Sequence, residues 1–367
     1  MPGNASPVPT FVEVANEVGY YLSLSVSIAI GLTVAALAIP EAHGGVVARR
    51  VRALAMPVAV FVAVVAVLRF FGTAADTAHV GFLHAFSGEV ILAALASPPS
   101  RGSALGSGVA ALIALMLFAV VVVGLTSMRR SASRWLAGGV TAVATVAALV
   151  PTIPASLSPI SASARNLLTA VHVLGALFWV GGLVVLATAG MMGRRDKSDD
   201  LYVARAAADW NQIWERYSVV ALYAVGALIV SGTWLAWSHV GSPVQLFTTS
   251  YGRYLAVKLL LVIALLVAGA YNMRVVMPKI RAAEHDHDIR RMFHLAVEHF
   301  PVVVVAESVV AFGILVIVPF LRGSARSEAG EASAGPFDLT VFGTGVALVA
   351  LTAVALWAGT RTPTKVR

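Results

Sequence analysis

The chain has 367 residues, of which 59% are hydrophobic and only 12% are charged. Soluble domains carry roughly 45–50% apolar and about 25% charged residues, so this composition excludes an ordinary soluble enzyme. The lack of cysteine excludes disulfides, thiolate zinc sites and cysteine-ligated iron–sulfur clusters. Apolar runs of roughly 18 or more residues are too long for transmembrane β-strands. We therefore expect an all-α integral membrane protein.

Nine stretches have the length of about 20 apolar residues that a spanning helix needs. They cover 18–39, 53–72, 105–127, 135–151, 166–192, 217–239, 253–277, 300–321 and 337–359. Residues 80–97 are also apolar, but a span there would reverse the orientation of every later loop. We expect a re-entrant or interfacial helix on the outer face instead. The sequence thus predicts a polytopic bundle of about nine transmembrane helices.

The basic residues set the orientation of the bundle. Of the 26 Lys and Arg residues, 19 fall in the loops and tail of one side and six on the other, with Lys258 inside a helix. The positive-inside rule places the N-terminus outside and the C-terminus in the cytoplasm. The net charge of +8 is then a topology signal, and we expect no nucleic-acid partner.

Two basic side chains, His172 and Lys258, stand out inside predicted spans, where ionisable groups are costly and therefore functional candidates. His172 lies about seven residues, roughly 10 Å, below the outer boundary. It is either a ligand of a metal or haem, a proton acceptor, or a buried histidine bonded to a neighbouring helix. Lys258 is either the counter-charge of a carboxylate or bound anion, or a lysine that snorkels to the outer headgroups.

Polar groups also occupy the cytoplasmic half of the spans. Glu307 lies too deep for its short side chain to reach water, so it must be protonated, paired or lining a water-filled cavity. We interpret Asn272 as an interhelical hydrogen-bonding group. Met273 and Met277 are one helical turn apart, and thioether ligands suit Cu(I).

A second set of candidate ligands lies on the outer face: His79, His84, Glu89 and His239, together with His172. Imidazole and carboxylate suit Cu(II) or Zn(II), but interfacial histidines are also simply solvated by headgroups. His79 and His84 are about 140° apart on a helix, so one helix cannot direct both to a single ion. The chain contains no nucleophile–base pair or nucleotide-binding motif, and we do not expect an enzyme.

Several helices together resemble one family. The segments are HVLGALFWVGGLVVL (172–186), RYSVVALYAVGALIVSGTWLAW (216–237), TSYGRYLAVKLLLVIALLVAGAYN (249–272) and VVAESVVAFGILVIVPFL (304–321). An H-x6-W-x-G helix, a YGR-x4-K helix and a late helix with a lone glutamate are similar to the copper resistance protein D (CopD) family. The resemblance covers about residues 165–322 well. It implies that His172, Trp179, Lys258 and Glu307 occupy family motif positions.

The resemblance also suggests a division of the chain. Residues 1–164 would form an N-terminal four-helix membrane region with the outer helix 80–97. Residues 165–322 would form a CopD-like membrane domain. Residues 323–367 would be a linker of small residues followed by an additional C-terminal transmembrane helix.

The resemblance implies copper transport, as import or handling, across the bacterial plasma (inner) membrane. Cu(I) or Cu(II) would be the substrate, and a CopC-like extracytoplasmic copper-binding protein a partner besides the lipid bilayer. The alternative is a b-type haem protein, or an accessory or assembly subunit of a respiratory membrane complex. Haem needs axial histidines from facing helices, and His172 has only His84 and His239 as candidate partners.

The topology can be tested with single cysteines, because the native chain has none. An Asp200→Cys variant should be labelled only from the cytoplasmic side, since residues 193–216 belong to the basic side. Labelling of position 200 by an impermeant reagent added outside intact cells would overturn the predicted orientation.

Overall fold

The computed structural model describes residues 8–38, 45–99, 104–131, 133–153, 160–193, 200–276, 278–279, 300–332, 334–335 and 338–361. All regular elements in these ranges are helices. The predicted all-α class is therefore confirmed.

Eight helices in the described ranges are long and apolar enough to span a membrane. They are α1 (Phe11–Leu32) with its π-helical continuation η1 (Thr33–Leu37), α2 (Val46–Ala78), α4 (Ser107–Met128), α5 (Arg134–Leu149), α6 (Ile160–Gly193), α7 (Asp200–His239), α9 (Ser250–Tyr271) and α12 (Phe300–Ile317). The ninth predicted span is also helical, as α14 (Leu339–Arg361).

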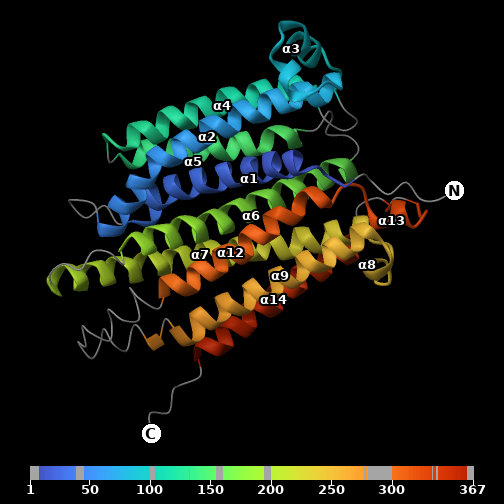
Figure 1. The fold of residues 1–367 in the computed structure, drawn as a ribbon. Helices are drawn as coiled ribbons and strands as arrows, with labels where there is room; N and C mark the ends of the chain where they lie inside the picture. Colours follow the sequence, from blue (N-terminus) through green and yellow to red (C-terminus); the bar gives the residue numbers. More distant parts are fainter. Residues whose placement is uncertain are drawn as a thin grey trace.

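Residues 80–97 form two short helices rather than a span. They are the 3-10 helix η2 (Phe82–Phe86) and the eight-residue helix α3 (Gly88–Leu95). Eight residues rise only about 12 Å, less than half of a bilayer core. His79 is the C-cap residue that follows α2, and its left-handed backbone (φ 54°) turns the chain into this segment. The segment lies at one end of the bundle (Figure 1).

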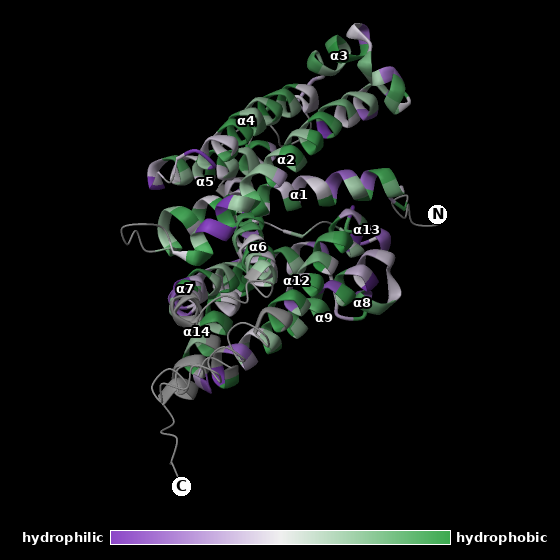
Figure 2. Cartoon of the chain, turned by 60° about the vertical axis from the view of Figure 1, so that its left-hand side comes forward, coloured by the Kyte–Doolittle hydropathy of each residue, from purple (hydrophilic) through white to green (hydrophobic). Residues whose placement is uncertain are grey.

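The long helices run side by side, and the connections lie at the two ends of the bundle (Figure 1). α1 begins at the end where α3, α8 (Gln245–Thr248) and α13 (Ala325–Glu328) lie, and α14 ends at the opposite end. Figure 2 shows hydrophobic residues along most of the helices. Large apolar side chains such as Val64, Leu260 and Val267 are exposed on their outer faces. Such faces suit contact with lipid.

The predicted linker makes specific contacts with the bundle. The Glu328 carboxylate of α13 accepts hydrogen bonds from the backbone N–H of Ser250 (2.7 Å) and Tyr251 (3.1 Å), at the first turn of α9. These are free N–H groups of a helix N-terminus, where a carboxylate is favourable. α14 packs closely on α7. The two backbones approach so nearly that an added Cβ at Gly345 would lie 3.1 Å from the Cα of Val230.

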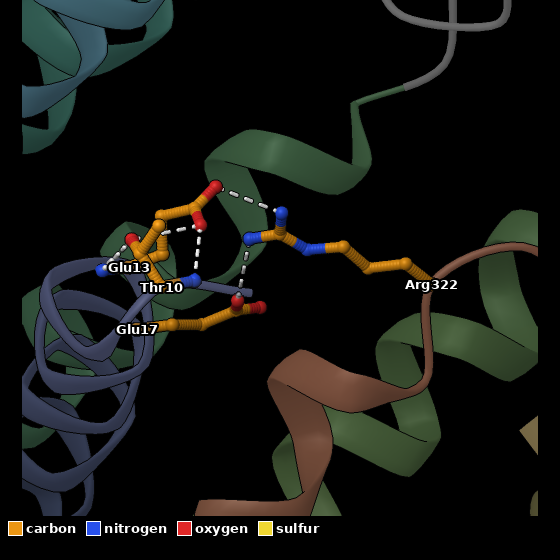
Figure 3. Close-up of polar contacts among 4 residues, drawn as sticks. All are labelled: Thr10, Glu13, Glu17 and Arg322. Carbon is orange, nitrogen blue, oxygen red and sulfur yellow. Dashed lines mark hydrogen bonds and ion pairs between the residues drawn. The ribbon is translucent and has the colours of Figure 1, made fainter. Parts of the chain in front are cut away.

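The end of α12 is tied to α1 by charged side chains (Figure 3). Arg322 follows η6 (Val318–Phe320), and its guanidinium lies 2.9 Å from Glu13 and 4.0 Å from Glu17. Glu13 also accepts a hydrogen bond from the backbone N–H of Thr10 (2.7 Å) and so completes the capping box of α1. One carboxylate thus serves both the start of α1 and the end of α12.

Close packing around α6 depends on glycine. A Cβ at Gly181 would overlap the backbone carbonyl oxygen of Ser25 on α1. Small residues of this kind let helix backbones approach in membranes, where association relies on van der Waals packing. α6 contacts α1, α7 and α12, and so lies centrally in the bundle.

A Gly181→Ala variant should be destabilised by about 1–3 kcal/mol, the usual cost of overpacking, because the obstacle is backbone and cannot rotate away. Thermal unfolding of the purified protein in detergent measures the effect. Gly269→Ala is the matched control: no atom lies within 4 Å of the added methyl, so this variant should be unchanged or slightly more stable. Equal stability of the two variants would contradict the packing described.

Candidate functional site

The polar groups predicted within the later spans lie on or next to four neighbouring helices. α6 packs against α7, and α12 packs against both α6 and α9. Polar residues on these helices form two separate groups. One is near the end of the bundle where α9 finishes and α12 begins, and the other is nearer the end with α8.

The first group is built on Glu307 of α12 and Asn272, which we call the carboxyl–amide pair. Glu307 is only 4% exposed and Asn272 only 1%. The Asn272 amide Nδ2 donates a hydrogen bond of 2.6 Å to the Glu307 Oε1. Asn272 is also the first residue of a π-helical turn, η4 (Asn272–Val276), which follows α9. Such turns occur frequently at functional sites.

Tyr217 of α7 lies beside this pair and was not singled out by the sequence. Its hydroxyl donates a 2.6 Å hydrogen bond to the backbone carbonyl of Trp179, and the backbone amide of Leu183 bonds the same oxygen. Its ring occupies the space beside Gly182, where any Cβ would overlap it. The phenol also interacts electrostatically with Glu307. The only sequence signal for this contact was the glycine pair that follows Trp179.

The second group is built on His172 of α6. Its Nδ1 lies 3.1 Å from the Oγ of Ser231 on α7. The Ser231 hydroxyl donates to the Ala227 carbonyl at 2.5 Å, so its oxygen accepts from a protonated Nδ1. A neutral ring in this tautomer keeps the lone pair on Nε2, the nitrogen that can take a proton or a metal ion. The Lys258 ammonium acts electrostatically on this ring.

The predicted outer ligands lie at separate places in the fold. His79, His84 and Glu89 are exposed on the segment between α2 and α4. His239 is half-buried at the end of α7, where its Nδ1 contacts the Leu235 carbonyl (2.8 Å) and its ring stacks on Tyr251. In the described ranges, no three or more His, Asp or Glu side chains gather as a metal site. Their role as ligands stays a prediction.

The positions of the histidines also bear on the alternative of a b-type haem protein. His239 lies eight residues after Ser231 on α7, about 12 Å along the helix from the partner of His172. His84 belongs to η2 at the edge of the bundle. His239 thus lies on the helix that faces His172 but well along it from the level of Ser231, and His84 lies on a different segment. Of the two methionines, the side chain of Met273 and all of Met277 lie outside the described residues.

Residues 211–321 match the family described as copper resistance protein D. This stretch includes Tyr217, Ser231, Lys258, Asn272 and Glu307, whereas His172 and Trp179 precede it. The family resemblance of α7, α9 and α12 is thereby confirmed for this part of the chain. No curated protein and no solved structure matches the chain.

Replacing Tyr217 by phenylalanine should lower the free energy of unfolding by about 0.5–1.5 kcal/mol, because the buried hydrogen bond to the Trp179 carbonyl is lost. Thermal unfolding in detergent is the measurement. Tyr223→Phe on the same helix is the control, since Tyr223 is 76% exposed and should contribute nothing measurable. A Tyr217→Phe protein as stable as the wild type would show that the hydroxyl does not hold α7 to α6.

Proposed function

We propose that this protein moves copper across the bacterial plasma membrane. The family match, which implies copper handling at a membrane, supports the proposal. The observation that carries it is the carboxyl–amide pair, which is buried inside an apolar helix bundle. A bundle that only needed to be stable would gain nothing from an ionisable group at this depth, because such groups are costly in the bilayer and are otherwise rare there.

The proposed route runs from His172 toward the carboxyl–amide pair. Copper enters at the outer face, where the available Nε2 of His172 is a suitable nitrogen ligand. Glu307 supplies a carboxylate part-way along the route. Met273 and Met277 would be the last ligands at the cytoplasmic end. Because thioethers prefer Cu(I), the ion would leave them in this oxidation state.

The orientation and the partners are part of the same proposal. With the N-terminus outside and the C-terminus in the cytoplasm, the exposed His79 and His84 face the extracytoplasmic space. A CopC-like copper carrier would deliver its ion to this face. Import is the direction we favour, because the sulfur ligands lie at the receiving end.

Replacement of Glu307 by glutamine should abolish copper-dependent accumulation while the protein still folds. Glutamine keeps the shape of the side chain and can still bond Asn272, but it removes the charge and the titratable proton. Cellular copper is measured by metal analysis in a strain that depends on this protein, with its expression compared by immunoblot.

Ser308→Ala is the matched control for this variant. Ser308 is the next residue on α12, and its hydroxyl bonds only the carbonyl of Val304 on its own helix (2.8 Å). It should therefore accumulate copper like the wild type. Full accumulation by a normally expressed Glu307→Gln protein would make the carboxyl structural and would remove the basis of the proposal.

A different measurement distinguishes the haem alternative from copper transport. An absorption spectrum of the purified protein that shows a Soret band would support haem, and metal analysis after growth with and without copper would then show iron. We expect no Soret band, and copper that copurifies with the protein.

A further inference from the structure

The carboxyl–amide pair has one polar atom that its surroundings do not satisfy. Asn272 Oδ1 is buried and has no hydrogen-bond partner among the described residues, although the other end of the same amide donates to Glu307. An unpaired buried acceptor is unfavourable, because it has lost its hydrogen bonds to water and gained none in return. We therefore expect a hydrogen-bond donor next to Asn272 Oδ1.

Glu307 becomes that donor when its carboxyl is protonated. A carboxylic acid and a primary amide are matched in shape, so that two hydrogen bonds can close a ring between them. The amide N–H donates to Oε1, as observed, and an O–H on Oε2 donates to Oδ1. An ionised carboxylate offers only acceptors, and it would place a second acceptor oxygen beside the Asn272 carbonyl.

Exchanging the two ends of the amide leads to the same result. The nitrogen and oxygen of an asparagine have nearly the same shape, and their assignment follows from the hydrogen-bonding network. With the ends exchanged, Oδ1 itself would lie 2.6 Å from Glu307 Oε1. Two oxygen acceptors at this distance require a proton between them, and 2.6 Å is within the range of O–H···O hydrogen bonds. In both assignments a protonated carboxyl satisfies the amide oxygen, whereas an ionised carboxylate leaves it without a donor.

The neighbouring charges do not provide another way to satisfy Glu307. In the described part of the chain, no Lys, Arg or His nitrogen forms an ion pair with it. Tyr217 of α7 is the ionisable group that acts on it electrostatically, and its phenol donates to Trp179. α9 contributes Asn272, and from α6 and α1 the described residues bring no charged group to the pair.

We propose that Glu307 binds a proton and donates it to Asn272, which makes the carboxyl–amide pair a proton-binding site between α9 and α12. The inference rests on the proposed function for its purpose: this proton would be the one exchanged as copper moves. Loss of the proton to water leaves a buried carboxylate facing an unpaired carbonyl.

Infrared difference spectroscopy of the protein in lipid nanodiscs at neutral pH, without copper, tests the site directly. We expect the wild type to show the C=O stretch of a hydrogen-bonded carboxylic acid that shifts in D2O. Glu307→Gln should lose this band, and Ser308→Ala should keep it. Asn272→Leu should keep the acid band but move it to higher wavenumber, because the ring of two hydrogen bonds is gone.

Two results would overturn the inference. One is a carboxylate band in place of the acid band at neutral pH, assigned by its loss in Glu307→Gln. The other is an acid band that Asn272→Leu leaves unmoved, which would mean that Asn272 is not the acceptor. Because no copper is present, either failure leaves copper handling untouched. Conversely, copper accumulation retained by Glu307→Gln defeats the proposed function and leaves the proton site standing.

Discussion

A polar group inside this bundle depends on other groups of the same chain for its hydrogen bonds, because lipid offers none. The central positions of the fold follow from this constraint. Asn272 bonds Glu307, His172 bonds Ser231, and Tyr217 bonds the backbone of Trp179. Each contact joins two different helices. The same interactions therefore position the helices and form the candidate site.

The helical spans and the site differ in how far the sequence predicts them. Spans follow from local composition, so eight of the predicted nine are found as long apolar helices, and α14 is helical as well. Residues 80–97 were correctly excluded as a span, because a charge rule that applies to the whole chain outweighed their local hydropathy. Glu307 and Asn272 stood out because charged and amide groups are rare in apolar runs.

Other parts of the site could not be read from the sequence. Tyr217 and Ser231 are ordinary residues in a transmembrane helix, and only the packing of α7 against α6 gives them partners. The outer histidines, by contrast, stood out in the sequence. Their residue types suit metal ligands, but the sequence does not say which of them lie together, and His79, His239 and His172 stand in different surroundings on α2, α7 and α6. Residue type indicates what a side chain can bind, whereas tertiary packing decides what lies next to it.

The anchoring of α9 and α12 is unequal at their two ends. Glu328 holds the first turn of α9, and Arg322 holds the chain just after α12 to Glu13 of α1. Both anchors lie at the end of the bundle where α1 begins (Figure 1). Toward the other end of the bundle, the hydrogen bond between Asn272 and Glu307 joins the two helices. A change in the hydrogen bond between Asn272 and Glu307 would therefore act on the part of this helix pair that lies away from both anchors.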